Sequence, residues 1–147
     1  MFKTTTYSYV VAILLALTCV SHTVGTFMEI PKEQIAVRAG YEVMQRTVVP
    51  MPFGVERMYS EIFLGTNLAV SLFLLFMTVV FVLLAKDVVS NNEFKILVAC
   101  IIVVGLLAVI SFRYFFPLPG ALLGSACIFG IVFAFQLQRR GLQIASK

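Results

Sequence analysis

The chain has 147 residues, of which 61% are hydrophobic and 12% are charged, and its mean hydropathy is +1.01. Soluble domains carry about 25% charged and about 45–50% apolar residues, so this composition excludes a water-soluble globular protein. The net charge of +4 is too small and too scattered for a nucleic-acid-binding surface.

Four charge-free windows predict four membrane-spanning helices. A spanning helix needs about 20 apolar residues, because the hydrocarbon core is about 30 Å thick and a helix rises about 1.5 Å per residue. The windows cover residues 4–28, 62–85, 96–112 and 114–138. We therefore expect an all-α membrane protein that forms a single integral membrane domain over residues 1–147. Its four-transmembrane-helix bundle would have helices at about 6–27, 60–85, 94–113 and 118–138.

The first window has two interpretations. Lys3, the apolar run 10–20 and the small residues near Gly25 are also typical of a cleaved secretory signal. However, residues 21–23 occupy the position of the cleavage site, and they form no A-x-A-like sequence. We expect the segment to be retained as the first spanning helix, with a cleaved signal as the alternative.

The distribution of Lys and Arg predicts that both termini are cytoplasmic. In this orientation six Lys and Arg residues lie inside and five lie outside. Two of the outer five, Arg38 and Arg46, are far from the helix ends, where a charge contributes less to orientation.

The polar loop 29–59 would then be extracytoplasmic. Together with Glu61, it holds nine of the eighteen charged residues. Pro31 can open a helix, after which Val37, Tyr41 and Met44 fall on one face. This pattern predicts a short amphipathic helix lying on the membrane surface in the first extracytoplasmic loop.

The remaining connections carry local signals. Residues 47–53 are apolar enough to sit in the membrane interface. Asn91 and Asn92 indicate a turn in the short connection between the second and third spans. Residues 113–120 combine aromatic side chains with helix breakers, so we expect a tight hairpin between the third and fourth spans.

Four ionisable residues are expected at the outer membrane face. His22 is the sole histidine, and an ionisable group at membrane depth is a functional candidate. Glu61 opens the second span, and Arg57 lies four residues before it, so the two can pair along one helical face. With Arg113, these side chains could line a small polar pocket capped by the first loop. The alternative is that charges gather where helices meet water, with Arg113 snorkelling and His22 bonding to a neighbouring helix.

Polar residues also form a stripe along the second span. Ser60, Asn67, Ser71 and Thr78 lie at spacings of seven, four and seven. We expect hydrogen bonds between helices along this stripe, and contact of Asn67 with a ligand is the alternative. Close packing within the bundle, or a homodimer, would explain the G-x-x-x-G of residues 120–124.

Several classes of chemistry lack the necessary residues. The three cysteines fall in three different helices without a C-x-x-C pair, so the chain has no redox dithiol. One histidine cannot build a zinc site or bis-histidine haem ligation within one chain. No phosphate-binding glycine loop, G-x-S-x-G or catalytic triad occurs either. We therefore expect no metal site, and no residue is assigned a catalytic role.

The start of the second span resembles a known family of small membrane proteins. The pattern is Phe53-Gly54-x-x-Arg57-x-Tyr59-Ser60-Glu61-x-x-x-Gly65-x-x-Leu68, running into an apolar helix, and it resembles the DoxX-like four-helix proteins. The resemblance singles out Glu61 and Gly65. Some DoxX-like members are associated with membrane oxidoreductase complexes, including thiosulfate oxidation linked to quinone. The resemblance thus implies the bacterial inner membrane, oxidoreductase subunits as partners and quinone as the candidate cofactor.

Three functions are consistent with these features. The first is an accessory or ligand-binding subunit of a membrane complex, with His22, Arg57, Glu61, Asn67 and Arg113 as candidates for its ligand pocket and with a quinone or lipid-like molecule as ligand. The second is a small intramembrane enzyme that uses His22 and Glu61 as an acid–base pair. The third is a purely structural assembly protein.

Overall fold

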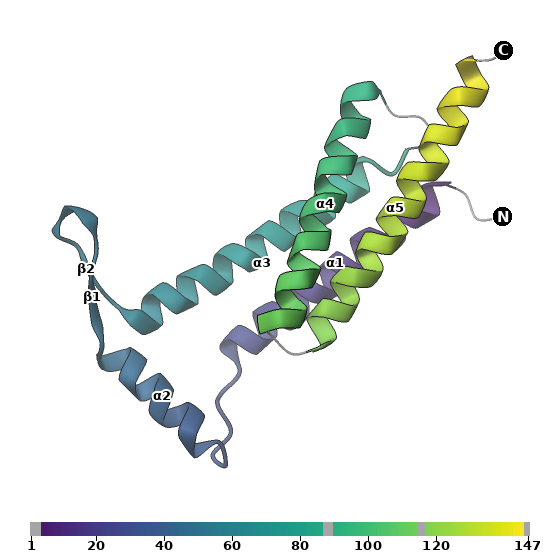
Figure 1. The fold of residues 1–147 in the computed structure, drawn as a ribbon. Coiled ribbons are helices and arrows are strands. Elements are labelled where there is room, and N and C mark those ends of the chain that lie inside the picture. Colours follow the sequence, from purple (N-terminus) through teal and green to yellow (C-terminus); the bar gives the residue numbers. More distant parts are fainter. Residues whose placement is uncertain (1–3, 87–89, 115–116, 146–147) are drawn as a thin grey trace.

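The computed structural model describes residues 4–86, 90–114 and 117–145, and for residues 114 and 140–145 it describes the backbone alone. Figure 1 shows the elements in chain order, which are α1 (Thr4–Phe27), α2 (Ile35–Arg46), β1 (Val48–Pro50), the 3-10 turn η1 (Pro52–Gly54), β2 (Glu56–Met58), α3 (Tyr59–Leu83), α4 (Asn91–Tyr114) and α5 (Pro117–Ala145).

Four helices in the described part of the chain, α1, α3, α4 and α5, are long and apolar enough to cross a membrane. This finding confirms a mainly helical protein with four apolar helices of spanning length, as predicted. The observed bounds differ at two ends, because α4 begins at Asn91 rather than near 94 and α5 continues past 138 to Ala145. Both extensions add polar residues to an apolar helix.

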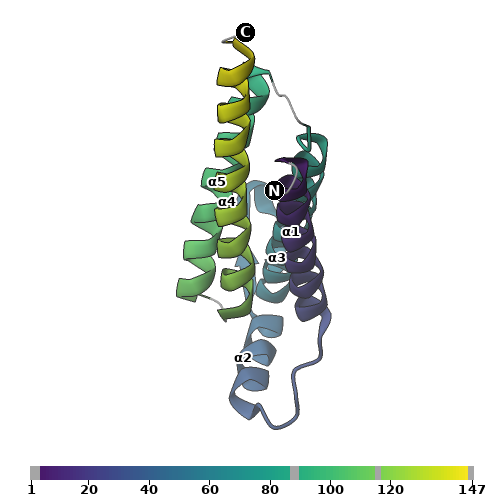
Figure 2. The same ribbon diagram turned by 90° about the vertical axis from the view of Figure 1, so that its right-hand side faces the viewer.

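The four long helices form two packed pairs. The helix α1 packs against both α3 and α5, and α5 packs in turn against α4. Figure 2 shows α1 beside α3 on one side and α4 beside α5 on the other. Within the described residues, α3 and α4 share no extensive contact although they are neighbours in the sequence. The pairs α1–α3 and α4–α5 are therefore joined through the contact between α1 and α5, around one shared core.

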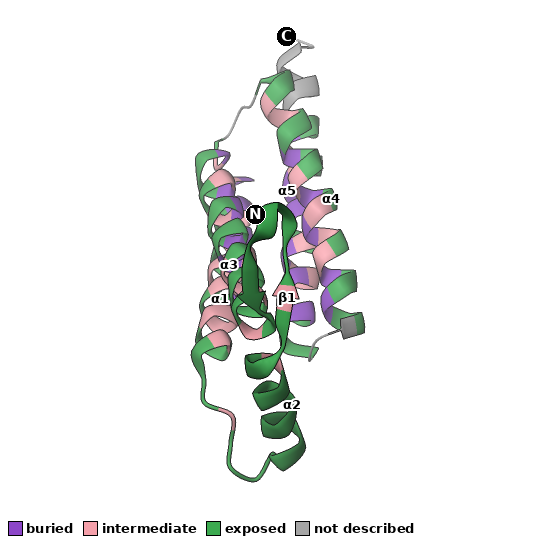
Figure 3. Cartoon of the chain, turned by 90° about the vertical axis from the view of Figure 1, so that its left-hand side faces the viewer, coloured by how far each residue is buried: buried purple, intermediate pink, exposed green. Residues whose placement is uncertain are grey.

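The buried core joins all four long helices. Its largest fully buried apolar side chains are Val11 and Leu15 of α1, Phe81 of α3, Leu97 and Val104 of α4, and Phe133 of α5. The outward-facing apolar side chains of the same helices remain exposed, as expected for surfaces that face lipid. Figure 3 shows buried residues along the long helices, whereas α2 has none and is exposed except at the half-buried Met44.

Polar side chains set the register between α1 and α3. The Ser8 hydroxyl donates to the Phe81 carbonyl oxygen at 2.6 Å. Near the other end of α1, the Thr23 and Ser71 hydroxyls are hydrogen-bonded at an oxygen–oxygen distance of 2.9 Å, and the Thr23 hydroxyl also lies 2.8 Å from the Cys19 carbonyl oxygen. The hydrogen bonding expected along the polar stripe of the second span therefore occurs at Ser71. Thr78, by contrast, donates to Leu74 within its own helix.

The glycines of the G-x-x-x-G pair serve packing between α4 and α5. A Cβ atom at Gly120 would lie 2.8 Å from the ring of Phe112, so only glycine lets the ring sit there without a shift. At Gly124 the same ring would be 3.8 Å away, which is an ordinary contact. Close packing within the chain thus uses these positions, and the homodimer stays a prediction.

The expected turn at Asn91 and Asn92 is wrong, because both residues lie in the first turn of α4. Ser90 caps this helix: the Glu93 N–H donates to the Ser90 hydroxyl at 3.2 Å, and the Ser90 N–H donates to the Glu93 carboxylate at 2.7 Å. Lys86 reinforces the cap with a salt bridge of 2.8 Å to Glu93. Residues 87–89, and residues 115–116 of the predicted hairpin, lie outside the described residues.

We expect Ser8→Ala to destabilise the protein by about 0.6–1.7 kcal/mol, because it removes a buried hydrogen bond between two helices. Ser21→Ala is a matched control on the same helix, since the Ser21 hydroxyl donates to Thr18 within α1. Thermal or denaturant unfolding in a bilayer mimic provides the measurement. Equal effects of the two substitutions would show that the Ser8 bond does not join α1 to α3.

Candidate functional site

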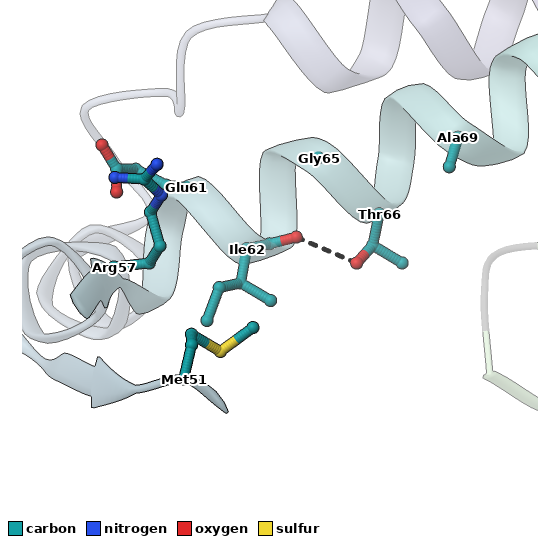
Figure 4. A pocket seen from close by; sticks show the side chains of 7 residues that line it. All are labelled: Met51, Arg57, Glu61, Ile62, Gly65, Thr66 and Ala69. Carbon is teal, nitrogen blue, oxygen red and sulfur yellow. Dashed lines mark hydrogen bonds between the residues drawn. The ribbon is translucent and has the colours of Figure 1, made fainter. Parts of the chain in front are cut away.

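An open groove lies between the β-hairpin and the first turns of α3. Figure 4 shows its lining residues, which are Met51 and Arg57 from the hairpin and Glu61, Ile62, Gly65, Thr66 and Ala69 from α3. The two charged side chains lie together at the end of the groove where α3 begins. The rest of the wall is apolar or small. We call this feature the hairpin–α3 groove.

The junction of strand and helix builds the polar end of the groove. Strands β1 and β2 pair antiparallel, with Arg57 opposite Val49, and β2 leads directly into α3. The Tyr59 N–H donates to the Thr47 carbonyl oxygen at 2.9 Å and holds the base of the hairpin against the helix start. The Glu61 carboxylate accepts the Met58 N–H at 3.0 Å, so it satisfies one of the free donors at the helix start.

The helical repeat supplies the other wall. Glu61, Gly65 and Ala69 follow one another at intervals of four residues and therefore share a face of α3. A Cβ atom at Gly65 would meet nothing within 4 Å, so this position is open. The Thr66 hydroxyl donates to the Ile62 carbonyl oxygen at 2.9 Å and is satisfied within the helix. A molecule in the groove would thus lie along a wall with little free hydrogen-bonding capacity.

The structure corrects the expected helical pairing of Arg57 with Glu61. Arg57 belongs to a strand, because the hairpin continues to Met58 and the helix begins only at Tyr59. The two side chains line the same groove, yet they form no salt bridge within 4.0 Å, since Lys86–Glu93 is the only such pair among the described residues. Both side chains are exposed at the mouth of the groove.

The other three candidate residues lie elsewhere. Asn67 is half-buried on α3 outside the groove lining, and His22 is half-buried on α1. Arg113 is exposed near the end of α4, which packs on α5 and shares no extensive contact with α3 among the described residues. The structure therefore does not bring His22, Arg57, Glu61 and Arg113 into one pocket. The packing of the helices is the physical reason, because a pocket shared by all four residues would require the start of α3 to pack against the end of α4, and these two helices share no extensive contact among the described residues.

The spacing along α3 also separates His22 from Glu61. Thr23, the residue after His22, bonds to Ser71. Ser71 lies ten residues beyond Glu61, which corresponds to about 15 Å along the helix axis. A shared proton requires contact directly or through one water, so this arrangement gives the acid–base pair no support.

Groups with metal-binding or redox chemistry are dispersed in the described residues. No three His, Cys, Asp or Glu side chains there converge in a way that could hold a metal ion. Cys19, Cys100 and Cys127 are free thiols on three different helices. The Cys19 thiol donates to the Ser71 carbonyl oxygen at 3.2 Å, so its observed role is packing of α1 on α3.

No family model, curated protein or solved structure matches this chain. The resemblance to DoxX-like proteins rests on the residues quoted above.

Sequence reasoning missed the hairpin wall of the groove. Residues 47–53 carry an apolar pattern that indicated an interfacial loop, and the short strand Val48–Pro50 went unrecognised. The sequence did contain a signal for a β-hairpin, because the short segments 48–50 and 56–58 flank a turn that contains Pro52 and Gly54. Met51 is the lining residue that this signal would have added.

We expect Glu61→Ala to loosen the first turn of α3 by about 0.5–2 kcal/mol, because the Met58 N–H loses its acceptor. Hydrogen–deuterium exchange of the amides at the start of α3 measures this effect directly. Glu56→Ala is the control, since Glu56 is an exposed carboxylate of β2 with no hydrogen bond to the described chain. Unchanged exchange in Glu61→Ala would contradict the capping role.

Proposed function

We propose that this chain binds an amphiphilic molecule, a quinone or a lipid-like compound, in the hairpin–α3 groove as an accessory or ligand-binding subunit of a membrane complex. One observation carries the proposal: the groove places Arg57 and Glu61 at the end of a candidate span and continues along its apolar wall. Ligand sites in proteins combine a mostly apolar wall with a few convergent polar groups in this way.

The dimensions suit an amphiphile. From Glu61 to Ala69 the helix rises about 12 Å, from the polar start of the span into its apolar part. A head group at the groove mouth would meet the Arg57 guanidinium, which donates well to phosphate or carbonyl oxygens and has no ion-pair partner among the described residues. A chain or ring extending inward would lie beside Gly65, where the helix leaves room.

The proposal includes a membrane setting. We place the chain in a bacterial inner membrane with both termini cytoplasmic, as the distribution of Lys and Arg and the resemblance to DoxX-like proteins favour. The groove then opens at the extracytoplasmic face. The helix α2 has Val37 and Tyr41 on its apolar side and Arg38 and Arg46 away from them. This distribution favours α2 as an amphipathic helix on that membrane surface.

The test is photolabelling of the purified protein in lipid nanodiscs, with a photoactivatable quinone and a photoactivatable phospholipid as separate probes. Gly65→Leu fills the groove and is expected to reduce labelling of residues 51–69 about tenfold for the probe that binds. Arg57→Gln is expected to reduce labelling several-fold by removing the head-group contact.

Two controls match these variants. Gly25→Leu adds the same side chain at another exposed helical glycine, and Arg38→Gln removes an exposed arginine on α2. Both should label like the unmodified protein. If Gly65→Leu labels as strongly as Gly25→Leu with each probe, the groove is not a ligand site and the purely structural role is favoured.

A further inference from the structure

The turn of the β-hairpin presents an apolar surface to its surroundings. Phe53 is 103% exposed, and Met51 and Val55 on either side are also exposed. No charged residue occurs between Arg46 and Glu56. A turn standing in water would ordinarily carry polar residues, so this composition needs an explanation.

The backbone conformation at the turn is energetically unfavourable for Phe53. Phe53 has φ 67° and ψ 21°, and the following Gly54 has φ 74°. In hairpins, two successive residues with positive φ are typical of type I′ turns, where Asn-Gly is the usual choice. A bulky aromatic side chain rarely adopts this conformation. Because the Phe53 side chain is fully exposed, contact with the described chain does not offset the cost, which points to a contact outside the protein.

The hairpin is directed back toward the spanning helices. Figures 1 and 3 show it turning from the junction of α2 and α3 along the level of the long helices, whereas α2 lies beyond their ends. In the groove, Met51 faces Ile62 of α3 (Figure 4). The tip therefore lies level with the first turns of an apolar span, beside the surface that lipid covers.

The backbone of the tip tolerates a partly dehydrated environment. Pro50 and Pro52 have no N–H, and the Met51 N–H donates to the Val55 carbonyl oxygen at 2.7 Å. The outer edges of the two short strands still need hydrogen-bonding partners, which the hydrocarbon core does not offer. The boundary between head groups and acyl chains meets both conditions, because water still reaches the strands there.

We propose that the hairpin tip, residues 51–55, inserts into the membrane interface beside α3, with lipid as the partner that covers Phe53. Arg46 and Glu56 at the ends of the charge-free segment remain on the aqueous side. The insertion does not require a ligand in the hairpin–α3 groove, so its test is independent of the test of the proposed function.

The absence of tryptophan from the chain allows a direct test. Phe53→Trp introduces a single fluorophore at the tip, and the protein is reconstituted at low density in phosphatidylcholine vesicles with or without brominated acyl chains. Phe135→Trp, at an exposed position within the α5 span, reports lipid contact. Glu33→Trp, in the exposed segment before α2, reports contact with water.

We expect brominated lipid to quench Phe53→Trp at least half as strongly as Phe135→Trp, and iodide to quench it about threefold less than Glu33→Trp. Val55→Trp, on the same tip, gives the same readout if Phe53→Trp fails to fold. Iodide quenching equal to that of Glu33→Trp would overturn the proposal, because the tip would stand in water. Protection from iodide without quenching by brominated lipid would also overturn it, because protein rather than lipid would cover the tip.

Discussion

The hydrogen bonds between α1 and α3 set the register on which the rest of the molecule depends. Ser8 meets Phe81 near one end of α1, and Thr23 meets Ser71 near the other. Because α1 ends at Phe27, only about one turn beyond Thr23, it leaves the first turns of α3 uncovered. The uncovered side of α3 is where the hairpin folds back and the groove forms. A longer α1, or a shifted register, would fill that space with another helix.

The packing of the helices has a second consequence for chemistry. Because α3 and α4 share no extensive contact among the described residues, polar residues near the end of α4 do not meet those at the start of α3. The residues that do come together, Arg57 and Glu61, belong to one strand–helix junction of the chain. This site is an open groove at the edge of the helices rather than an enclosed cavity, a form that is consistent with the amphiphile binding we propose.

Hydropathy predicted the four spanning helices, since a run of about 20 apolar residues has few other structures available to it. It could not predict their order, because apolar helices resemble one another and the cross-helix bond of Ser8 involves a backbone carbonyl that any residue provides. Of the site, Arg57 and Glu61 were identified, although their pairing on a helix was wrong. Their true relation depends on the hairpin, whose apolar residues 47–53 resemble an interfacial loop. His22 and Arg113 were grouped by depth alone, and depth does not determine which helices are neighbours.

Disulfide cross-linking between pairs of introduced cysteines tests the order of the helices most directly. In a background with Cys19, Cys100 and Cys127 replaced by alanine, Thr23→Cys combined with Ser71→Cys should cross-link readily, because their hydroxyl oxygens are 2.9 Å apart. Arg113→Cys combined with Glu61→Cys should not cross-link, because α4 packs on α5 and shares no extensive contact with α3 among the described residues. The reverse result, a cross-link between positions 61 and 113 and none between 23 and 71, would contradict this helix packing and restore the shared polar pocket.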